Sequence, residues 1–243
     1  MSDDRYRLSF DSVAETYERT RPGYADAAID WFEEHFPLTR VLDLGAGTGK
    51  LTRQLVDRGA DVVAVEPGEA MRAVLQRIVP QAAVLAGTAE SIPLPEAAVD
   101  VVTVGSAFHW FRTHEALAEM HRVLRPGGGC ALLGNEWDDT DPLVQRLNEI
   151  LTRLRPDDPT LLWREAFAAV DSSPLFRGRE ERSFPHRIRL DADALVGLMA
   201  SISAVAAASS EDQARVEAEV RALVHDPEVD FPMSTSVVLL HRV

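Results

Sequence analysis

Short hydrophobic runs alternate with longer segments of helical periodicity between about residues 40 and 135. The runs lack polar alternation, which is typical of strands buried on both faces of a sheet. They predict strands at Val41–Leu44, Val62–Val65, Ala83–Ala86, Val99–Val104 and Cys130–Gly134. Apolar residues spaced three and four apart predict intervening helices at Gly49–Arg58, Glu69–Val79 and Thr113–Leu124. Strands that alternate with helices in this way predict a mostly parallel sheet.

The pattern extends on both sides of this region. Residues 24–36 predict an amphipathic helix that ends before Pro37. Asp141 and Asp191 are suited to cap two of the later helices. The later predicted helices are Pro142–Arg155, Leu161–Val170, Ala192–Ala207 and Glu211–Val224, and the later strands are Arg179–Leu190 and Ser234–Arg242. We expect one domain over residues 1–243, with a core of about 24–137, 176–190 and 211–243 and a helical cover of about 1–23, 138–175 and 191–210.

Composition narrows the class of protein. A hydrophobic content of 46% with 26% charged residues is ordinary for a globular domain. The net charge of −14 disfavours nucleic acid as a partner, and Arg182, Arg187 and Arg189 are explained as exposed residues of a strand. The single cysteine, Cys130, allows no internal disulfide, and the scattered histidines predict no metal site. With no signal peptide and no bilayer-length apolar segment, we expect a cytoplasmic protein without a membrane partner.

The most specific feature is a glycine-rich loop between a predicted strand and a predicted helix. Residues 41–49 read VLDLGAGTG. Glycines permit a tight turn and let a ligand approach bare backbone. Glu66 ends the next predicted strand about 20 residues further on, where a carboxylate can accept both hydroxyls of a ribose. The spacing therefore predicts a nucleoside site.

Three kinds of nucleoside site compete for this loop. A phosphate-cradling NTPase loop fails, because Leu44 stands where its first glycine belongs and Leu51 follows Lys50 in place of Ser or Thr. A dinucleotide loop fails at its third glycine, because position 50 is lysine. Asp43 is unfavourable beside a pyrophosphate but suits a cationic ligand. The residues favour S-adenosylmethionine, a positively charged nucleoside without phosphates.

Several segments resemble a known family. They are YERTRPGY (17–24), LDLGAGTG (42–49), VEPGEAM (65–71), GTAESIPLP (87–95), VDVVTVGSAFHWF (99–111) and HRVLRPGG (121–128). With these segments the chain resembles class I S-adenosylmethionine-dependent methyltransferases of the type 11 group, and more loosely the trans-aconitate methyltransferase-like proteins. The resemblance implies a Rossmann-like α/β fold with a seven-stranded, mostly parallel sheet of order 3-2-1-4-5-7-6. Val237–Leu240 would lie in its antiparallel seventh strand.

The resemblance also implies the residues that hold the cofactor. Asp43 would face the amino-acid part, Glu66 would hold the ribose, and Ser106 would lie on the methionine side. Tyr17 and Arg21 would close over the cofactor. Pro67 and Met71 would flank the adenine, and Ala89 with Glu90 would border the edge of the base. The full implied set is Tyr17, Arg21, Asp43, Gly45, Ala46, Gly47, Gly49, Glu66, Pro67, Met71, Thr88, Ala89, Glu90, Ser106 and Ala107.

We expect the methyl acceptor to be a small molecule, methylated at oxygen, with S-adenosylhomocysteine as the second product. His109 is the candidate general base, because an imidazole can accept a proton near neutral pH. The expected substrate-pocket residues are Phe108, His109, Trp110, Trp137 and Met199, and Trp163 could join them. The alternatives are that His109 only hydrogen-bonds backbone and that the large apolar side chains fill core.

Two other functions stay open at this point. The chain could bind S-adenosylmethionine without transferring its methyl group, or it could be an NAD-dependent oxidoreductase. A monomer or a weak homodimer is expected.

Overall fold

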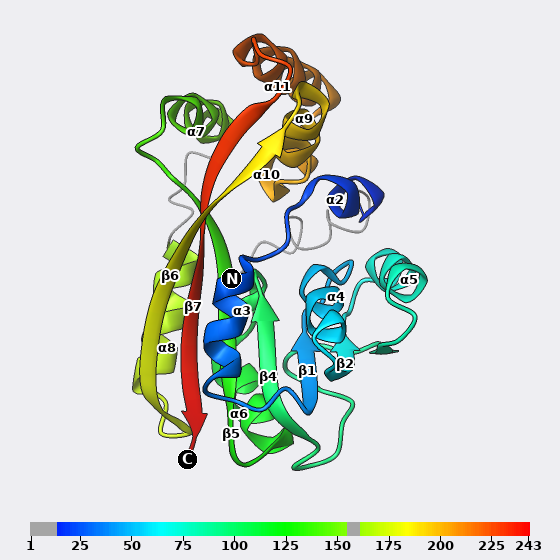
Figure 1. Cartoon of the computed structure of the whole chain (residues 1–243), viewed down its shortest axis with the longest axis vertical. Coiled ribbons are helices and arrows are strands. Elements are labelled where there is room, and N and C mark those ends of the chain that lie inside the picture. The colour runs from blue at the N-terminus through cyan, green and yellow to red at the C-terminus, as the bar shows by residue number, and fades with distance from the viewer. Residues whose placement is uncertain (1–13, 155–160) are drawn as a thin grey trace.

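The computed structural model describes residues 14–154 and 161–243. Its strands form one seven-stranded sheet in the order β3-β2-β1-β4-β5-β7-β6, which confirms the expected order (Figure 1). The strands are β1 (Arg40–Leu44), β2 (Asp61–Val65), β3 (Ala83–Leu85), β4 (Val99–Gly105), β5 (Leu124–Trp137), β6 (Phe176–Leu190) and β7 (Val229–Arg242).

The strands from β3 to β5 run parallel, and β7 is antiparallel to both β5 and β6. Four of the five residues of β1 and of β2 are buried, as their continuous apolar sequence predicts. Strands β5, β6 and β7 are longer than predicted. Strand β6 is largely exposed along its polar interior, whereas its end residues Phe176 and Leu190 are buried.

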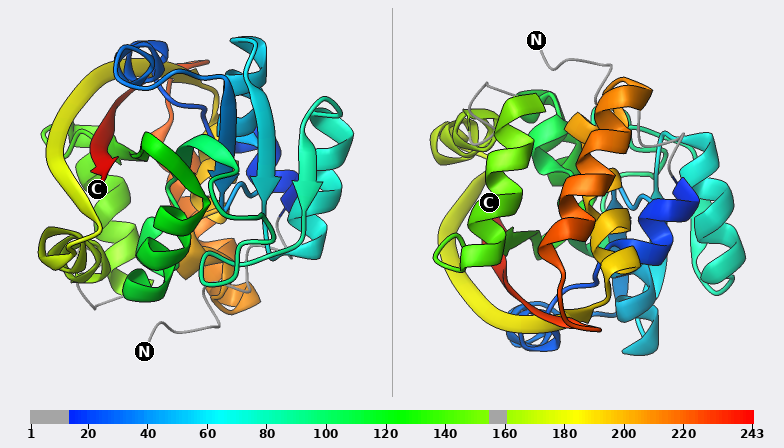
Figure 2. Two further views of the ribbon diagram at one scale, coloured as in Figure 1. Left: turned by 90° about the horizontal axis from the view of Figure 1, so that it is seen from below. Right: turned by 90° about the horizontal axis from the view of Figure 1, so that it is seen from above.

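Two hydrophobic clusters flank the sheet. On one face, α3 (Asp26–Glu33) and α4 (Lys50–Asp57) pack through residues such as Phe32 and Leu55. On the other face, α6 (Thr113–Val123) and α8 (Leu161–Ser172) pack through Met120 and Val170. Helix α5 (Glu69–Ile78) covers the β2–β3 side, where Leu75 is buried. All the strands contribute to one layer between these helices (Figure 2).

A third hydrophobic cluster lies above the sheet in a helical cover (Figure 1). The cover consists of α7 (Pro142–Leu154), α9 (Ala192–Ala200), α10 (Ser203–Ala206) and α11 (Ser210–Leu223). The ends of β6 and β7 enter the same cluster through Leu190 and Phe231. This differs from the expected division, because residues 211–224 pack in the cover and α8 packs against the sheet. The expected helix 192–207 is also interrupted at Ser201–Ile202.

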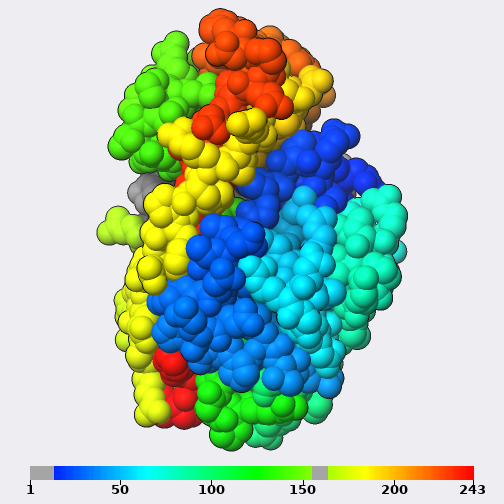
Figure 3. Space-filling model, viewed as in Figure 1, coloured from blue at the N-terminus to red at the C-terminus, as the bar shows by residue number. Residues whose placement is uncertain are grey.

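Helix α2 (Ala14–Thr20) lies in the segment 1–23 that was expected to contribute helical cover, although the sequence predicted no bounds for a helix there. It contacts both α9 of the cover and α5 beside the sheet, and the view from above shows it between them (Figure 2). In the space-filling view, the segment after α2 runs down the face between the cover and the helices that flank the sheet (Figure 3). The N-terminal segment therefore bridges the two parts of the molecule. Among the described residues, no helix is long and apolar enough to cross a membrane.

Candidate functional site

The glycine loop connects the carboxyl end of β1 to the first turn of α4. Gly45, Gly47 and Gly49 have positive φ angles of 69°, 55° and 91°. The amides of Gly45 and Ala46 donate to the carbonyl oxygen of Val65 at 2.8 and 3.2 Å. These bonds tie the loop to the end of β2, the neighbouring strand. Glycine is required at these three positions because residues with a side chain rarely adopt a left-handed backbone conformation.

The loop is closely packed at both ends and open in the middle. A Cβ added at Gly45 would lie 2.8 Å from the Cβ of Ala107, and one added at Gly49 would lie 2.2 Å from Leu75 Cδ1. A Cβ added at Gly47 would meet nothing within 4 Å. The backbone at Gly47 is thus accessible to a ligand, while its neighbours are held in place by protein contacts.

Glu66 comes directly after β2 and faces the same loop. Its side chain is largely buried, with 9% of the residue exposed. Oε2 accepts a hydrogen bond from the Gly47 amide at 2.9 Å, and Oε1 accepts one from the Gly68 amide at 2.8 Å. A carboxylate has about four lone-pair sites. A group with this acceptor capacity is suited to bind a pair of ligand hydroxyls.

Asp43 lies at the end of β1, beneath the glycine loop. It is 1% exposed, and its carboxylate accepts hydrogen bonds from the hydroxyls of Thr52 at 2.5 Å and Thr103 at 3.3 Å. Burial raises its pKa from 3.8 to about 6, and the nearby charge of Glu66 adds to the rise. A positively charged ligand would stabilise this carboxylate in its ionised form.

The residues expected around the adenine lie along the β2–β3 side. Met71 is 4% exposed and clusters with Ala14 and Val74, and Tyr17 of α2 packs against this cluster. Thr88 forms an isolated bridge with Ser91, beside the buried Ala89. Pro67 is exposed. Glu90 accepts a hydrogen bond from the Arg112 amide at 2.9 Å, which joins this segment to the start of α6.

Helix α2 lies on the amino end of α4 and is held there by Glu18. The Glu18 carboxylate accepts from the Thr48 hydroxyl at 2.7 Å and pairs with Lys50 at 3.2 Å and Arg53 at 3.3 Å. Sequence reasoning missed these contacts. Lys50, the only lysine in the chain, could have indicated a carboxylate partner. It stands in the first turn of α4, where a cation is electrostatically unfavourable without such a partner.

The end of α2 joins the cover. The Arg21 guanidinium donates to the Ser201 hydroxyl at 2.8 Å and to its carbonyl oxygen at 3.2 Å, and it lies over the Tyr17 ring at 5.3 Å. Thr20 contacts α9 at Gly197. A Cβ added at Gly197 would lie 2.3 Å from the methyl group of Thr20. Tyr17 and Arg21 thus lie between the cover and α5, and their expected closure over the cofactor stays a prediction. Arg21 is engaged by the cover.

The loop after β4 meets the glycine loop at Ala107. It contains a short 3-10 helix, η1 (Phe108–Trp110), in which His109 and Trp110 are partly exposed with ring centroids 4.7 Å apart. Phe108 is 1% exposed and packs beneath the loop against Phe167. His109 and Trp110 therefore lie at the carboxyl end of the sheet, whereas Phe108 belongs to the core rather than to a pocket.

The two pocket residues expected further along the chain lie in the cover. Trp137 packs edge-on against Phe231 with ring centroids 5.3 Å apart. Met199 is fully buried in the same cluster, so none of its side chain reaches an open surface. The structure brings neither of them to the glycine loop. The side chain of Trp163 lies outside the part of the chain that the structure describes.

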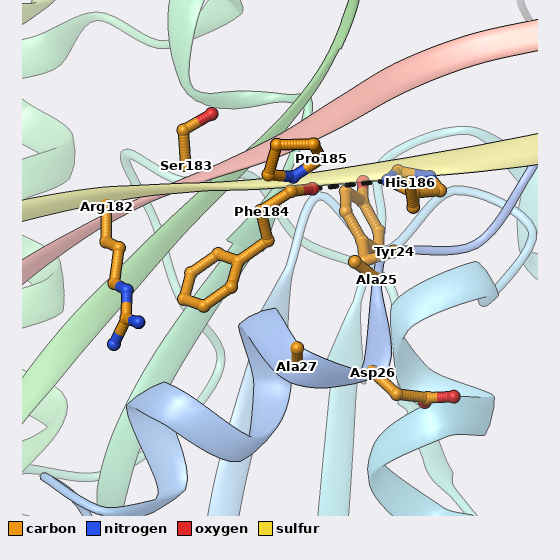
Figure 4. A pocket seen from close by; sticks show the side chains of 9 residues that line it. All are labelled: Tyr24, Ala25, Asp26, Ala27, Arg182, Ser183, Phe184, Pro185 and His186. Atoms are coloured by element: carbon orange, nitrogen blue, oxygen red, sulfur yellow. Dashed lines mark hydrogen bonds between the residues drawn. The ribbon is translucent and has the colours of Figure 1, made fainter.

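An open pocket of about 550 Å³ lies between β6 and the segment Tyr24–Ala27 at the start of α3 (Figure 4). Its lining includes Arg182, Phe184 and His186. It contains none of the expected cofactor residues. Across residues 14–154 and 161–243, no group of three or more His, Cys, Asp or Glu side chains could hold a metal ion.

Comparison with known proteins agrees with this geometry. The family profile described as "Methyltransferase domain" matches residues 42–132, which include the glycine loop, Glu66 and His109. An uncharacterized methyltransferase-like protein of Schizosaccharomyces pombe is 33% identical, in a match that covers 87% of this chain and 84% of the relative. This chain belongs to the class I S-adenosylmethionine-dependent methyltransferases.

Two further relatives support the family assignment. An uncharacterized methyltransferase of Mycobacterium tuberculosis is 51% identical over 148 residues, a match that spans 60% of this chain and 60% of the relative. A solved structure, a candidate type II methyltransferase from Anaeromyxobacter dehalogenans, has a TM-score of 0.67 at 26% identity and covers 91% of this chain and 97% of that one. The methyltransferase fold thus extends through both the sheet and the cover.

Proposed function

We propose that the protein transfers the methyl group of S-adenosylmethionine to an oxygen atom of a small-molecule acceptor and releases S-adenosylhomocysteine. The observation that carries this proposal is the convergence of Asp43, Glu66 and the open backbone of Gly47 at the ends of two adjacent strands. In open α/β sheets, ligands bind where the strand order reverses, which here is between β1 and β4.

Each of these groups matches one part of the cofactor. The oxygens of Glu66 would accept the two ribose hydroxyls, and the buried Asp43 would attract the cationic methionyl end. The Gly47 backbone offers close approach without a side chain in the way. Met71 and Tyr17 supply apolar surface on the adenine side. The residues present therefore fit the donor that the family uses.

Bound S-adenosylmethionine supplies a methyl group attached to a positively charged sulfur. When the methyl group is transferred, the rest of the molecule leaves as a neutral thioether. The protein then has to orient the acceptor oxygen in line with that methyl, and such positioning can contribute roughly 7–11 kcal/mol. A carboxylate acceptor needs no base. For a hydroxyl acceptor, His109 at the end of β4 would take the proton.

The test combines binding and turnover. Calorimetry should show binding of S-adenosylmethionine and S-adenosylhomocysteine but not NADH. Mass spectrometry should then detect a methylated product from a panel of carboxylates, phenols, alcohols and amines. Product formed only from amines would contradict the oxygen target. Binding without any product would favour a non-catalytic cofactor-binding protein, and binding of NADH alone would favour an oxidoreductase.

A further inference from the structure

Residues Gly23–Ala25 come after the closing helix α2 and are bound by side chains from three other elements. Asn135 donates its amide to the Gly23 carbonyl oxygen at 2.9 Å. Gln54 of α4 accepts from the Tyr24 amide at 2.9 Å and donates to the Tyr24 carbonyl oxygen at 2.8 Å. The Ala25 amide donates to the Thr235 hydroxyl at 2.9 Å. This short segment is therefore fixed relative to β5, β7 and α4.

Because the backbone of Gly23–Ala25 is fixed, the Tyr24 side chain is positioned beside the end of β4. Its hydroxyl donates a hydrogen bond to Ser106 Oγ at 3.1 Å. A Cβ at Gly105 would lie 2.5 Å from the Tyr24 hydroxyl oxygen, so the absence of a side chain at 105 makes room for the phenol. Burial raises the pKa of the Tyr24 phenol well above its usual range. The phenol stays protonated and acts as the donor.

Ser106 has an unusual backbone. Its φ of 54° is in the left-handed region, which residues other than glycine adopt only where their surroundings enforce it. Its amide donates to the Leu133 carbonyl oxygen at 2.8 Å, and its side chain accepts from Tyr24. The backbone bond and the side-chain bond hold Ser106 from two directions and together fix its conformation.

The turn at Ser106 sets the direction of the loop that leaves β4. Ala107 is pressed against Gly45, and η1 with His109 begins at the next residue. A small rotation at Ser106 would move this loop relative to the glycine loop. Positioning errors of this kind reduce rates even when binding persists.

We propose that Tyr24 is a positioning residue for methyl transfer: its hydroxyl holds Ser106 in the left-handed turn that sets the Ser106–Trp110 loop against the glycine loop. This inference rests on the proposed function. Because Ser106 Oγ accepts from Tyr24, its own proton can be donated only to a different acceptor. Tyr24 itself neither gives nor takes a proton in the reaction.

Amide hydrogen exchange tests directly whether Tyr24 holds the Ser106–Trp110 loop in place. This experiment does not require the methyl acceptor to be identified. In Tyr24→Phe and in Ser106→Ala, the amides of residues 104–112 should exchange about tenfold faster than in the wild type. The double variant should exchange no faster than the faster single variant, because both substitutions remove the same bond. Ser183→Ala, which removes a 2.5 Å hydroxyl contact to Ser234 at the β6 edge, should leave this segment unchanged. The proposal would be overturned if the increases in exchange rate from the two single variants multiplied in the double variant. It would also be overturned if exchange in Tyr24→Phe were the same as in the wild type.

Turnover provides the second readout, with the acceptor panel supplied as a mixture. Tyr24→Phe should lower the rate of S-adenosylhomocysteine formation about tenfold at every pH from about 6 to 9, while the Kd for added S-adenosylhomocysteine changes less than about threefold. A rate loss that varies with pH would assign proton transfer to Tyr24 and overturn the positioning role. If the wild type neither binds the donor nor turns over, the proposed function fails, and the exchange measurement still decides whether Tyr24 holds the loop.

Discussion

At the residue scale, Asp43 and Glu66 are two carboxylates with different environments at one site. Asp43 is buried beneath the loop and accepts from two hydroxyls, whereas Glu66 is bound by two backbone amides. The negative charge of Glu66 contributes to the raised pKa of Asp43. A cationic ligand between them would relieve this repulsion, so the site favours a positive charge before any ligand arrives.

Replacing Asp43 should stabilise the protein in a pH-dependent manner. Its pKa is about 6 in the folded state against an ordinary value of 3.8, so the folded state favours the protonated form. The stability that this form contributes is full below about pH 4 and is lost as the pH rises through about 6. Asp43→Asn should therefore gain stability over the wild type between pH 4 and 7, by at most about 3 kcal/mol. Thermal unfolding of both proteins from pH 4 to 8 measures this difference.

The control is Asp57→Asn, an exposed carboxyl at the end of α4. Its stability difference from the wild type should stay nearly constant over the same range. An Asp43→Asn difference that shrinks as the pH rises would contradict the burial argument. The same variant should bind S-adenosylmethionine less tightly, because the attraction for the cation is gone.

Glu66→Gln should weaken S-adenosylhomocysteine binding tenfold or more. The proposed role of Glu66 is to accept the ribose hydroxyls, and glutamine replaces one charged acceptor oxygen by an NH₂ group that cannot accept, so one ligand hydroxyl loses a charge-assisted bond. Loss of a charge-assisted hydrogen bond costs about 1.5–3 kcal/mol. Calorimetry gives the affinity, and Glu69→Gln, an exposed residue in the first turn of α5, is the matched control. Equal affinities for the two variants would remove Glu66 from the site.

At the element scale, α2 is attached to the helices beside the sheet through ion pairs of unequal burial. The Glu18 and Lys50 side chains are 15% and 13% exposed. Glu15 and Arg77, also a pair between α2 and a sheet-flanking helix, are 69% and 59% exposed. Exposed pairs contribute about 0–1 kcal/mol, whereas breaking a well-buried pair costs several times more. Glu18 is therefore the main electrostatic attachment of this helix.

Glu18→Gln should speed release of S-adenosylhomocysteine about tenfold, equivalent to about 1.4 kcal/mol. The substitution leaves Lys50 largely buried without its carboxylate, and α2 separates from α4 more often. Stopped-flow displacement measures the rate. Glu15→Gln on the same helix should change it less than about twofold. If the two variants behave alike, α2 is not held through Glu18.

The sequence predicts elements best where local chemistry decides them. Asp141 and Asp191 were expected caps, and both accept hydrogen bonds from backbone amides at 2.9 and 2.7 Å. The parallel core is predictable from continuous apolar runs, whereas the strand order came from family resemblance. The bounds of helix α2 were not predicted, because its seven residues carry little apolar periodicity and are held by distant partners.

The same distinction applies to the site. Asp43, Glu66 and the glycines meet as expected, because adjacent parallel strands end at one edge, and their roles toward the cofactor stay predictions. Tyr24 was missed because its partner, Ser106, is 82 residues away. No local pattern links a tyrosine to a serine at that separation.

At the scale of the whole molecule, the cover has its own hydrophobic core, separate from the two clusters that flank the sheet. Leu198 is fully buried in that core. Helix α2 and the strands β5, β6 and β7 connect the cover to the sheet. The stability of the cover therefore depends on packing that the sheet does not supply.

Leu198→Ala should destabilise the protein by about 2–5 kcal/mol, since it leaves a cavity in a fully buried cluster. Urea unfolding gives the change in free energy. Val243→Ala, at a residue 63% exposed, should stay within about 0.5 kcal/mol of the wild type. A loss below about 1 kcal/mol for Leu198→Ala would mean that the cover packs more loosely than the structure indicates.

The β6–β7 pair is hydrogen-bonded from Phe176 opposite Arg242 to Leu190 opposite Val229. Everything between Leu190 and Val229 is an insertion at the tip of one long hairpin. Residues 191–228 can therefore be exchanged as one segment without breaking the pairing of β6 and β7. Grafting residues 191–228 from a relative would replace α9, α10 and α11 of the cover while both splice points remain paired, which makes this hairpin the natural boundary for chimeras of the cover.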